Sequence, residues 1–563
     1  MFYILMAVLF LNPDVKKASK KSQIIRAILG LITGFILFYI FNMDRSISFI
    51  LSSLWIPALF QIISSGILRK KGSYSKTLIK VMTIILFFSI GYKFYPYDTL
   101  GAKKLAGIVP VKESNDTVSK IDAAHVIVIS PETAYYEMQK MLGTLDNPSV
   151  YKIGQLGVTM TKDGACYVAP IEVDGFFRAL SNKEIPGVMY VSAEKPSEAK
   201  VIKSSVNYAE SFVFGKDLAR HLRKYKPHSV LFQTNAELDD EGNVYYVGSY
   251  GHYKYGRKGP VMDGVLLFSF KDGKVSDYPK DKVPSWVDEV YPSDVSESYN
   301  YYFGSLKKGL INRIFIKEGV HIPTAWKSQT SVDGLSVNSK EVTGVIDSDG
   351  KLKWFTDHTN TSNTSTTMTG YSLMNMRTGD MIYYKTPGYI NGKGAMNAVD
   401  KTLGANKANW TPVQPLFYNI FGTEAWVVPV VNKADGALIK VAIVAAQNSY
   451  VVLEDNKDSA IESFKNAIAY GKISSNSNKN ANSLKAEEKT VKGKVSRITP
   501  VTENGDTIFY VKLFGNNTVF MVNKSSGIDI VLTKENDDVQ IKYIDIKDNN
   551  VVSVTEFRNN NIK

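Results

Sequence analysis

The sequence predicts a membrane-anchored α+β protein, in which three or four N-terminal transmembrane helices precede α+β domains rich in antiparallel sheet and a small C-terminal all-β module. Three observations lead to this prediction. Four apolar segments crowd into residues 1–97, Asp-Gly and similar turn pairs recur through the central part, and residues 489–563 contain strand-like runs without a helical pattern. Strands that do not alternate regularly with helices are typical of antiparallel sheets.

Residues 1–97 are expected to form the membrane anchor. A transmembrane helix needs about 20 apolar residues to cross about 30 Å of hydrocarbon. Three of the segments come close to this length, whereas the first covers only about half of that thickness at ~1.5 Å per residue. The first segment is expected to be either a thin fourth span or a re-entrant piece. The four segments are residues 1–11, 27–43, 47–68 and 78–92.

The basic residues of the anchor predict its orientation. They cluster in two of the three connections, whereas the connection between the second and third segments holds only Asp44 and Arg45. Because clustered Lys and Arg stay on the cytoplasmic side, we expect a multi-pass protein of the cell membrane whose chain after Tyr92 lies outside the cytoplasm. The residues that determine this topology are Lys16, Lys17, Lys20, Lys21, Arg26, Arg69, Lys70, Lys71, Lys76 and Lys80.

The net charge of +13 does not indicate nucleic-acid binding. Residues 1–97 contain twelve Lys or Arg against Asp14 and Asp44, which leaves a net charge of only +3 for the other 466 residues. The basic character therefore belongs to loops that face anionic lipid, and a nucleic-acid partner is not favoured. Cys166 is the only cysteine, which excludes an intramolecular disulfide and a cysteine-based zinc site. Abundant Lys, Asn and Ile favour a bacterial origin.

Residues 98–120 are expected to form a stalk, and residues 121–305 a first α+β domain. In that domain, residues 124–130 are predicted to form a buried strand, and Pro131 is predicted to begin a helix because proline suits the first helical position. Further helical stretches are predicted at 216–224 and 287–303.

Residues 306–471 are expected to form a second α+β domain, with helices at 395–403 and 459–470 among its strands. A flexible linker rich in Ser and Asn follows at 472–488, and residues 489–563 are expected to form a small barrel similar to an OB-fold. Tight hairpins are predicted where Asp-Gly or a similar pair supplies positive φ, at Asp163–Gly164, Glu241–Gly242, Asp272–Gly273, Asp349–Gly350, Asp435–Gly436 and Asn504–Gly505.

The sequence contains no catalytic or metal-binding signature, so we expect no catalytic residue, no metal ligand and no cofactor. Ser249 in YVGSYG lacks the spacing of a nucleophile elbow, and no two histidines have the i, i+4 spacing of a helical metal site. Cys166 follows a turn in an apolar strand and is expected to be buried and unreactive. His125 is expected at the edge of the core.

One tyrosine-rich segment is a candidate binding surface. Tyrosine next to arginine is the composition of many recognition surfaces, and strand alternation places some of these side chains on an exposed face. The alternative is a strand buried on both sides. The candidate residues are Tyr246, Tyr250, His252, Tyr253, Tyr255, Arg257 and Lys258.

These observations favour binding over catalysis. We expect an integral membrane protein whose extracytoplasmic body binds an envelope protein or polymer, as a scaffold or assembly factor. The alternative is a membrane-tethered envelope hydrolase whose carboxylates converge from separate loops. The expected partners are the lipid bilayer and envelope or membrane proteins, and a homo-oligomer is left open. A channel or transporter is not favoured, because the long spans show no buried ionisable residue.

Overall fold

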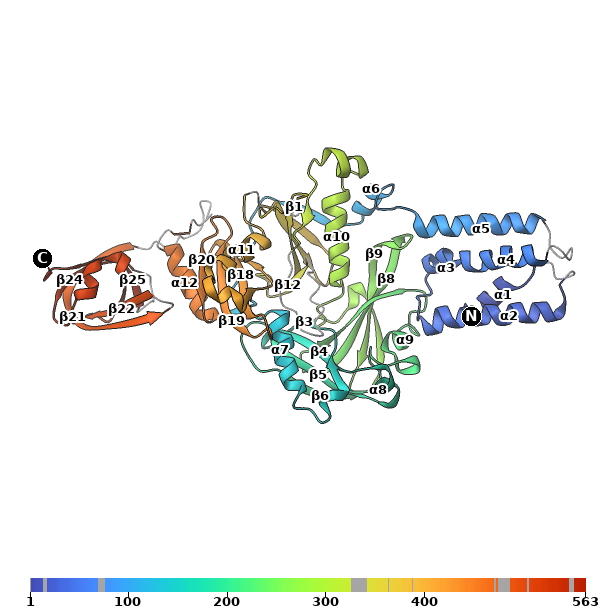
Figure 1. Cartoon of the computed structure of the whole chain (residues 1–563), viewed down its shortest axis with the longest axis horizontal. Coiled ribbons are helices and arrows are strands. Elements are labelled where there is room, and N and C mark those ends of the chain that lie inside the picture. The colour runs from blue at the N-terminus through green and yellow to red at the C-terminus, as the bar shows by residue number, and fades with distance from the viewer. Residues whose placement is uncertain are drawn as a thin grey trace.

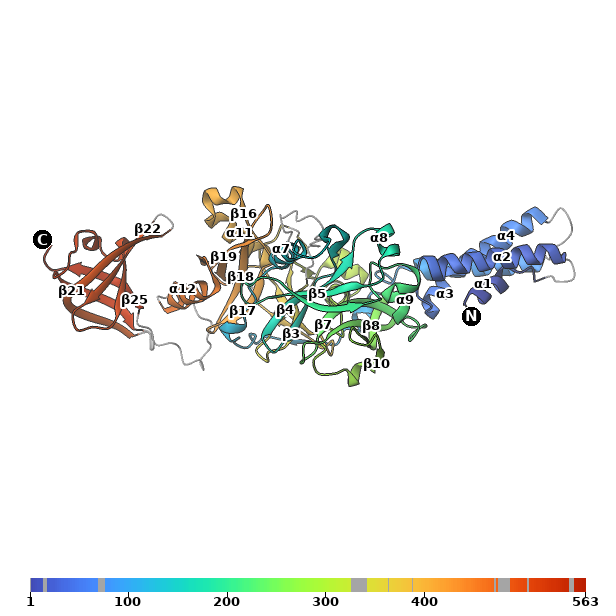
Figure 2. The ribbon, with the colours of Figure 1, turned by 90° about the horizontal axis from the view of Figure 1, so that it is seen from below.

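The computed structural model describes residues 2–13, 18–68, 76–325, 342–362, 364–386, 388–469, 472–473, 487–503, 506–545 and 551–562. The molecule is elongated, with apolar helices at one end, a β-rich body in the middle and a small barrel at the other end (Figures 1 and 2). Its helices are combined with sheets that are mostly antiparallel. This confirms the α+β part of the predicted fold class.

The N-terminal end consists of α1 (Phe2–Phe10), α2 (Lys20–Phe35), α3 (Ile47–Ser53), α4 (Trp55–Leu68) and α5 (Lys76–Phe94), with a π-helical turn, Ile36–Ile40, that extends α2. Among the described residues, two stretches are long and apolar enough to cross a membrane, Lys20–Ile40 and Ile47–Ser65. The sequence predicted three or four. Of the other two predicted spans, α1 has only nine residues, and α5 has 19 residues, some of whose side chains lie outside the described part of the chain.

Helix α1 packs closely against α2 at two glycines with G-x-x-x-G spacing. A Cβ atom on Gly30 would lie 2.7 Å from the Cα of Ala7, and one on Gly34 would lie 3.2 Å from the Cβ of Met6. Small residues at this spacing let two helix backbones approach each other. The two glycines therefore let α1 approach α2 closely, and at Gly30 even the Cβ of an alanine would not fit without moving α1.

The sequence had suggested that Arg26 lies in a loop, but it lies inside the helical bundle, on α2. Its side chain donates from Nε to the Phe10 carbonyl at 3.0 Å, and from Nη2 to Gln61 Oε1 and Ser64 Oγ, each at 2.7 Å. Because the carbonyls that end a helix lack partners and carry partial negative charge, a cation is favourable there. Arg26 is 4% exposed, which corrects the expectation that the apolar helices bury no ionisable residue.

The first part of the body contains two antiparallel sheets. One has the order β2-β4-β5-β6, with β3 also paired to β4, and the other is the meander β10-β9-β8-β7. Helices α7 (Pro131–Leu142) and α9 (Leu218–Leu222) form where the sequence predicted them. The strands are β2 (Tyr151–Ile153), β3 (Gly157–Thr161), β4 (Gly164–Val173), β5 (Ile185–Ser192), β6 (Lys200–Val206), β7 (Val230–Leu238), β8 (Val244–Tyr255), β9 (Lys258–Ser269) and β10 (Val275–Pro279).

The second part of the body contains two more sheets and three longer helices. One sheet has the order β1-β15-β14-β13-β11 with β12 paired to β13, and the other has the order β16-β18-β19-β20 with β17 paired to β18. Its elements are α10 (Ser293–Leu306), β11 (Ile322–Pro323), β12 (Thr343–Ile346), β13 (Leu352–Thr359), β14 (Gly370–Asn375), β15 (Met381–Lys385), α11 (Gly392–Thr402), β16 (Trp410–Pro412), β17 (Leu416–Ile420), β18 (Thr423–Asn432), β19 (Leu438–Ala445), β20 (Val451–Glu454) and α12 (Lys457–Ala469).

Residues 98–120 belong to the folded body and are not a free stalk. Helix α6 (Ala102–Ala106) packs against α10, and β1 (Val111–Ser114) pairs in parallel with β15. One hydrophobic core runs from Ala102 to Ile473 and so crosses the expected boundary near residue 305. The segment predicted as a linker, 472–488, lies almost entirely outside the described residues.

In the segment 124–130, residues 126–130 are buried as predicted and Ala124 and His125 are exposed, and the segment is not a paired strand. It begins in a short 3₁₀ turn, Ala123–His125, and continues as extended chain. The amides of Val128 and Ile129 both donate to the carbonyl of Ala193 at 3.0 Å. Two bonds to a single carbonyl cannot continue as a strand ladder, because successive ladder bonds alternate along the partner strand.

The turn predictions hold wherever the structure describes them. The glycines of the first five predicted pairs have φ between +68° and +107° and connect paired strands, whereas Asn504–Gly505 lies outside the described residues. The C-terminal strands close into a five-stranded barrel in the order β21-β22-β23-β25-β24, the strand number of an OB-fold. They are β21 (Glu487–Glu503), β22 (Asp506–Leu513), β23 (Val519–Asn523), β24 (Asp538–Asp545) and β25 (Val551–Asn559).

Candidate functional site

A cavity of about 870 Å³ opens in the body where the two sheets of the first part meet β12, Trp354 and Gln414 of the second part. Its walls come from the β2–β3 segment, strand β7, the first turns of α7 and α10, and α9 with the residues that follow it. This volume lies within the range of small-molecule sites. Acidic side chains outnumber basic ones on the walls, with Glu132, Glu172, Glu210, Glu289 and Asp294 against Lys152 and Arg223.

Two of these carboxylates, Glu172 on β4 and Glu210 after β6, lie next to each other. Glu172 accepts hydrogen bonds from the backbone N–H of Ser211 at 2.9 Å, from the Ser211 hydroxyl, and from the backbone N–H of Glu210 at 3.3 Å. The Tyr246 hydroxyl donates to the same carboxylate at 3.2 Å. Four donors around one carboxylate hold it in a fixed position.

Glu210 has a different environment from Glu172. Its carboxylate accepts a hydrogen bond from the Thr234 hydroxyl. Burial of the carboxyl raises the pKa of Glu210 to about 7, and the negative charges of Glu172 and Asp217 contribute to the same shift. The residue as a whole has a large solvent-accessible surface, because it lines an open cavity. Its carboxyl group is nevertheless surrounded by protein atoms that exclude most bulk water. Glu210 therefore changes charge near neutral pH.

A second pair of carboxyl groups, Glu237 and Asp288, is buried beside the same wall. Glu237 accepts the backbone N–H groups of Asp288 at 2.8 Å and Glu289 at 3.1 Å, and its own burial raises its pKa well above the usual range, followed by the charge of Asp288. Asp288 accepts from Met160 N at 2.6 Å and Thr159 Oγ1 at 2.8 Å. Burial raises the pKa of Asp288 to about 6. These two groups lie behind the cavity wall, next to the lining residues Asn235 and Glu289, and resist ionisation.

The body holds the N-terminal helices with three arginines at the end of α2. Arg220 donates to the carbonyl of Tyr39 at 2.6 Å, and its guanidinium lies 4.2 Å from the centre of the Tyr39 ring. Arg223 donates to the carbonyl of Asn42. Arg257, at the tip of the β8–β9 hairpin, donates to Asp44 Oδ2 at 2.9 Å. The connection between the two apolar stretches is therefore clamped to the body.

Part of the tyrosine-rich segment is buried in the core, and part of it lies at the contact between the body and the N-terminal helices. Tyr246 and Tyr250 are buried, at 1% and 4% exposure, and Tyr250 donates to Asp277 at 2.7 Å. His252 is exposed and pairs with Asp263 at 2.9 Å. The remaining residues lie near the end of the body that contacts the N-terminal helices: Tyr253 beside Phe232, Tyr255 stacked on Tyr97, Arg257 on Asp44, and Lys258 on Asp98. Their role in binding an external partner stays a prediction.

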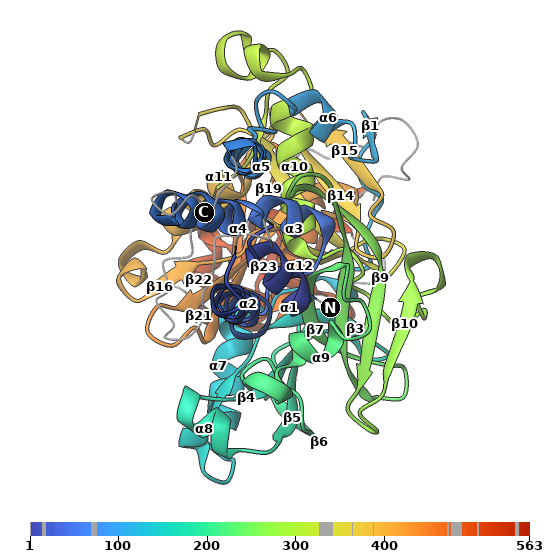
Figure 3. The same cartoon turned by 90° about the vertical axis from the view of Figure 1, so that its right-hand side faces the viewer.

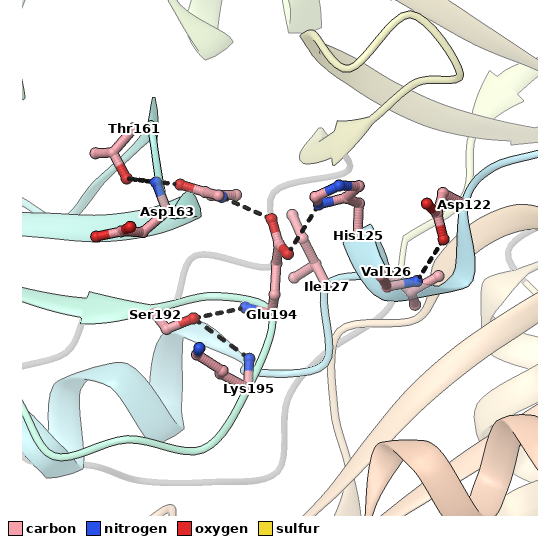
Figure 4. A network of polar contacts seen from close by, with 12 residues as sticks. Asp122, His125, Val126, Ile127, Thr161, Asp163, Ser192, Glu194 and Lys195 are labelled. Atoms are coloured by element: carbon pink, nitrogen blue, oxygen red, sulfur yellow. Dashed lines mark hydrogen bonds and ion pairs between the residues drawn. The ribbon is translucent and has the colours of Figure 1, made fainter. Parts of the chain in front are cut away.

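A polar network beside β4 and β5 ties segments that are distant in the sequence (Figure 4). Glu194 accepts the Ala165 N–H at 2.7 Å and contacts His125 Nδ1 at 3.2 Å. His125 is exposed and does not lie at the core edge as expected. Lys457 of α12 donates to three backbone carbonyls, those of Ala124, Val126 and Glu194. All three ammonium protons are thus used in structural contacts.

Two histidines that are far apart in the sequence meet beneath α10. His321 Nδ1 and His358 Nδ1 lie 2.8 Å apart, and His358 Nε2 lies 3.0 Å from Asn300 Oδ1. Burial lowers the pKa of His321 to about 4 and that of His358 further below its usual range. Both rings are therefore neutral at physiological pH. Among the described residues, no group of three His, Cys, Asp or Glu side chains is arranged to hold a metal ion.

Sequence reasoning missed the cavity residues because they come from unconnected segments. Glu172 lies in an otherwise apolar strand, which is the signal that was available, since a charged residue in a buried strand needs a partner. Gly30 and Gly34 were detectable from their G-x-x-x-G spacing. Cys166 is buried at 2% exposure as expected, and burial raises the pKa of its thiol to about 12.

Of the ten topology-determining residues, Lys20, Lys21 and Lys80 are exposed on the helices, and Arg26 is buried as described above. The side chains of Lys16, Lys17, Arg69, Lys70, Lys71 and Lys76 lie outside the described part of the chain.

No known protein family matches the sequence, and no curated protein matches it. Among solved structures, an exo-β-1,3-galactanase from Clostridium thermocellum shares 10% identity, covering 72% of this chain and 76% of its own, with a TM-score of 0.19. An endo-arabinase from Bacteroides thetaiotaomicron shares 10% identity, covering 65% of this chain and 92% of its own, with a TM-score of 0.16. The polysaccharide lyase Uly1 shares 8% identity, covering 71% and 60%, with a TM-score of 0.14. Similarity at these TM-scores carries no conclusion about function.

Proposed function

We propose that this chain is a multi-pass membrane protein whose extracytoplasmic body binds a cationic, hydrogen-bonding group of an envelope protein or polymer, as a scaffold or assembly factor. The acidic cavity is the observation that carries the proposal. Its wall places Glu172 and Glu210 side by side, with Glu289 and Asp294 on the same surface. An amine or guanidinium between such carboxylates gains charge-assisted hydrogen bonds and relieves the repulsion between them.

The arrangement of the apolar helices supports the membrane part of the proposal. The body contacts the end of the first apolar stretch and the connection after it, at Tyr39, Asn42 and Asp44, through Arg220, Arg223 and Arg257. Lys20 and Lys21 start α2, and Lys80 lies in the first turns of α5. These lysines are therefore at the helix ends that point away from the body (Figure 1). Because clustered cations stay in the cytoplasm, the body then lies on the outer side.

Protease treatment of intact protoplasts tests the orientation. One tag is placed after Lys563 and another in the connection near Lys70. We expect loss of the C-terminal tag and retention of the other. Protection of both tags contradicts an extracytoplasmic body.

Calorimetry on the full-length protein in detergent tests the cavity. The probes are tri-lysine and a trimer of glucosamine, with the trimer of N-acetylglucosamine as the neutral control. We expect binding of the amine-bearing probes only, weakened at least about tenfold in Glu172→Gln/Glu210→Gln, since a hydrogen bond to a charged group contributes about 1.5–3 kcal/mol. Equal binding of the neutral trimer contradicts a cationic ligand.

A membrane-tethered envelope hydrolase is the second candidate function, and the Glu172–Glu210 pair favours it. Neighbouring carboxylates in different environments are the usual arrangement of a general acid and its ionised partner. Glu210, whose pKa is about 7, has the proton that an acid needs, and Glu172 is fixed by four donors. The test is release of soluble fragments from dye-labelled cell walls. Glu210→Gln abolishes release if the protein is a hydrolase, and absence of release by the unaltered protein excludes this candidate for that polymer.

A further inference from the structure

We propose that two apolar projections of the body rest in the outer leaflet of the bilayer beside the anchor helices, so that the lipid surface itself is their partner. The first projection is α8 (Phe176–Ser181), and the second is the π-helical turn Asn312–Ile316 with Ile311 before it. The inference rests on the membrane anchoring proposed above and adds a second, peripheral contact between body and membrane.

The first projection exposes aromatic side chains that a soluble surface would hide. Phe177 is 82% exposed and Phe176 54%, and their rings lie against each other at 5.6 Å. Leu180 continues the same exposed surface, whereas Ala179 faces the body and is buried. A short helix with its large apolar side chains turned outward is suited to an apolar environment and not to water.

The second projection has the same character. Phe315 is 78% exposed, and neighbouring isoleucines are exposed with it, namely Ile311, Ile314 and Ile316. Lys317, which ends the turn, adopts a left-handed conformation with φ of +57°. The turn thus presents a compact apolar surface followed directly by a cation.

The first projection is linked to the end of α2 through the 3₁₀ turn Phe214–Lys216. Lys216 Nζ donates to the carbonyl of Lys183, two residues after α8, at 2.8 Å. In the same turn, the Phe214 ring lies over Tyr39 at 6.2 Å with nearly parallel planes. Tyr39 lies in the last turn of an apolar stretch, where tyrosine is favoured at the membrane interface. These contacts connect α8 to the end of α2, where the anchor leaves the membrane.

The second projection is linked in a similar way to the end of α5. Helix α6 begins eight residues after Phe94 and packs against α10. A Cβ atom on Gly309, just before the turn, would lie 3.3 Å from the Cε of Lys103 in α6. Viewed from the anchor end, α8 and the yellow-green segment that follows α10 project on opposite sides of the anchor helices (Figure 3).

The charges near the two projections fit an anionic lipid surface. Lys183 and Lys216 lie beside α8, and Arg313 and Lys317 belong to the second projection. Apolar side chains flanked by Lys and Arg are typical of segments that lie in the interfacial layer of a membrane. This combination favours lipid over a protein partner, whose surface would have to follow both projections and the anchor at once.

Single-cysteine fluorescence in the full-length protein tests the inference. Cys166, the only native cysteine, is buried, so an introduced cysteine takes the label. Phe177→Cys and Phe315→Cys are labelled with an environment-sensitive fluorophore. Vesicles of phosphatidylglycerol and phosphatidylethanolamine carry lipids spin-labelled either near the headgroup or near the chain end.

Two controls separate this inference from the anchoring on which it depends. Ile32→Cys reports on the Lys20–Ile40 stretch, and Phe514→Cys reports on an exposed phenylalanine of the terminal barrel. We expect quenching at Phe177 and Phe315 that is stronger with the shallow spin label, quenching at Ile32 by the deep label, and none at Phe514. Quenching at Ile32 without quenching at either projection overturns the inference alone. Absence of quenching at Ile32 overturns the membrane anchoring itself.

Discussion

Arg257 donates a hydrogen bond to Asp44 at 2.9 Å across 213 residues of sequence. The two residues join the tip of the β8–β9 hairpin to the connection between the two long apolar stretches. Asp44 is nearly buried, with 6% of its side chain exposed, whereas 39% of the Arg257 side chain is exposed. The body and the helices are thus joined by a charged contact as well as by aromatic packing.

Arg257→Ala is expected to destabilise the full-length protein by about 1–3 kcal/mol, because it leaves the Asp44 carboxylate buried without its cation; a fully buried pair would lose about 3–5 kcal/mol. Thermal unfolding in detergent measures the change, and a double-mutant cycle with Asp44→Ala isolates the coupling. The exposed pair Lys140–Glu137 is the control, with an expected effect below about 0.5 kcal/mol. A coupling energy near zero would show that the contact does not hold the anchor.

Gly30→Ala is expected to separate α1 from α2. Overpacking should lower the free energy of unfolding by about 1–3 kcal/mol. The added Cβ would lie 2.7 Å from backbone atoms of Met6 and Ala7, which cannot move independently. Gly91→Ala is the matched control in α5, since nothing lies within 4 Å of its Cβ position. Disulfide trapping between cysteines placed in α1 and α2 measures their proximity, and equal trapping in both variants contradicts the prediction.

Lowering the pH from 7 to 4 is expected to destabilise the region around His321 and His358. Burial lowers both pKa values in the folded protein, to about 4 for His321. The unfolded chain therefore binds more protons below about pH 6.5, so this contribution to stability is complete above that pH and is lost as the pH falls toward 4.

His358→Gln tests the contribution of the histidine pair to this pH dependence. The slope of stability against pH is expected to decrease by up to about 1.4 kcal/mol per unit, the amount that corresponds to one proton. The comparison with His252→Gln, which alters an exposed histidine, separates the buried pair from the general effect of acid. Parallel curves for the unaltered protein and His358→Gln contradict this account.

Glu210 is expected to give a pH dependence of the opposite sign. Because its folded pKa is raised to about 7 from the usual value of 4.5, the folded protein holds a proton that the unfolded chain releases. Stability from this group is therefore lost as the pH rises through that window. Glu210→Gln should remove this loss and make the protein more stable at pH 8 than the unaltered chain. Glu297→Gln, at an exposed position on α10, is the control and should leave the pH profile unchanged.

Lys457→Met is expected to destabilise the contact between α12 and the segment 124–126 by about 1–3 kcal/mol, because it leaves buried carbonyl groups without a donor. The three acceptors are the carbonyls of Ala124, Val126 and Glu194. Hydrogen exchange of the full-length protein should show faster exchange in α12. Lys465→Met, on the same helix, is the control.

Local features of the fold were predictable because they depend on neighbouring residues. The turn at Asp435–Gly436 has the positive φ that a glycine allows, and α7 starts at Pro131 with Ser130 as its cap. The segment 111–114 was not predicted as a strand, because its partner β15 lies some 270 residues later and nothing in its own polar sequence indicates pairing.

The candidate site was not predictable from the sequence for the same reason. Glu172, Glu210 and Tyr246 come from three segments whose proximity depends on how the two sheets pack. The tyrosine-rich segment was correctly recognised as unusual in composition. Its pattern did not reveal that Arg257 and Lys258 face Asp44 and Asp98 of the same chain.

Helix α9 contacts both the cavity and the anchor, and this has a thermodynamic consequence. Ala219 and Arg223 belong to the cavity wall, while Arg220 and Arg223 hold Tyr39 and Asn42. If occupancy of the cavity shifts Arg223, the seating of α2 against the body shifts with it, and reciprocity requires that strain on α2 changes ligand affinity by the same factor. With the membrane anchoring proposed above, mechanical or lipid-dependent changes in the bilayer would then alter the fraction of cavities that hold ligand.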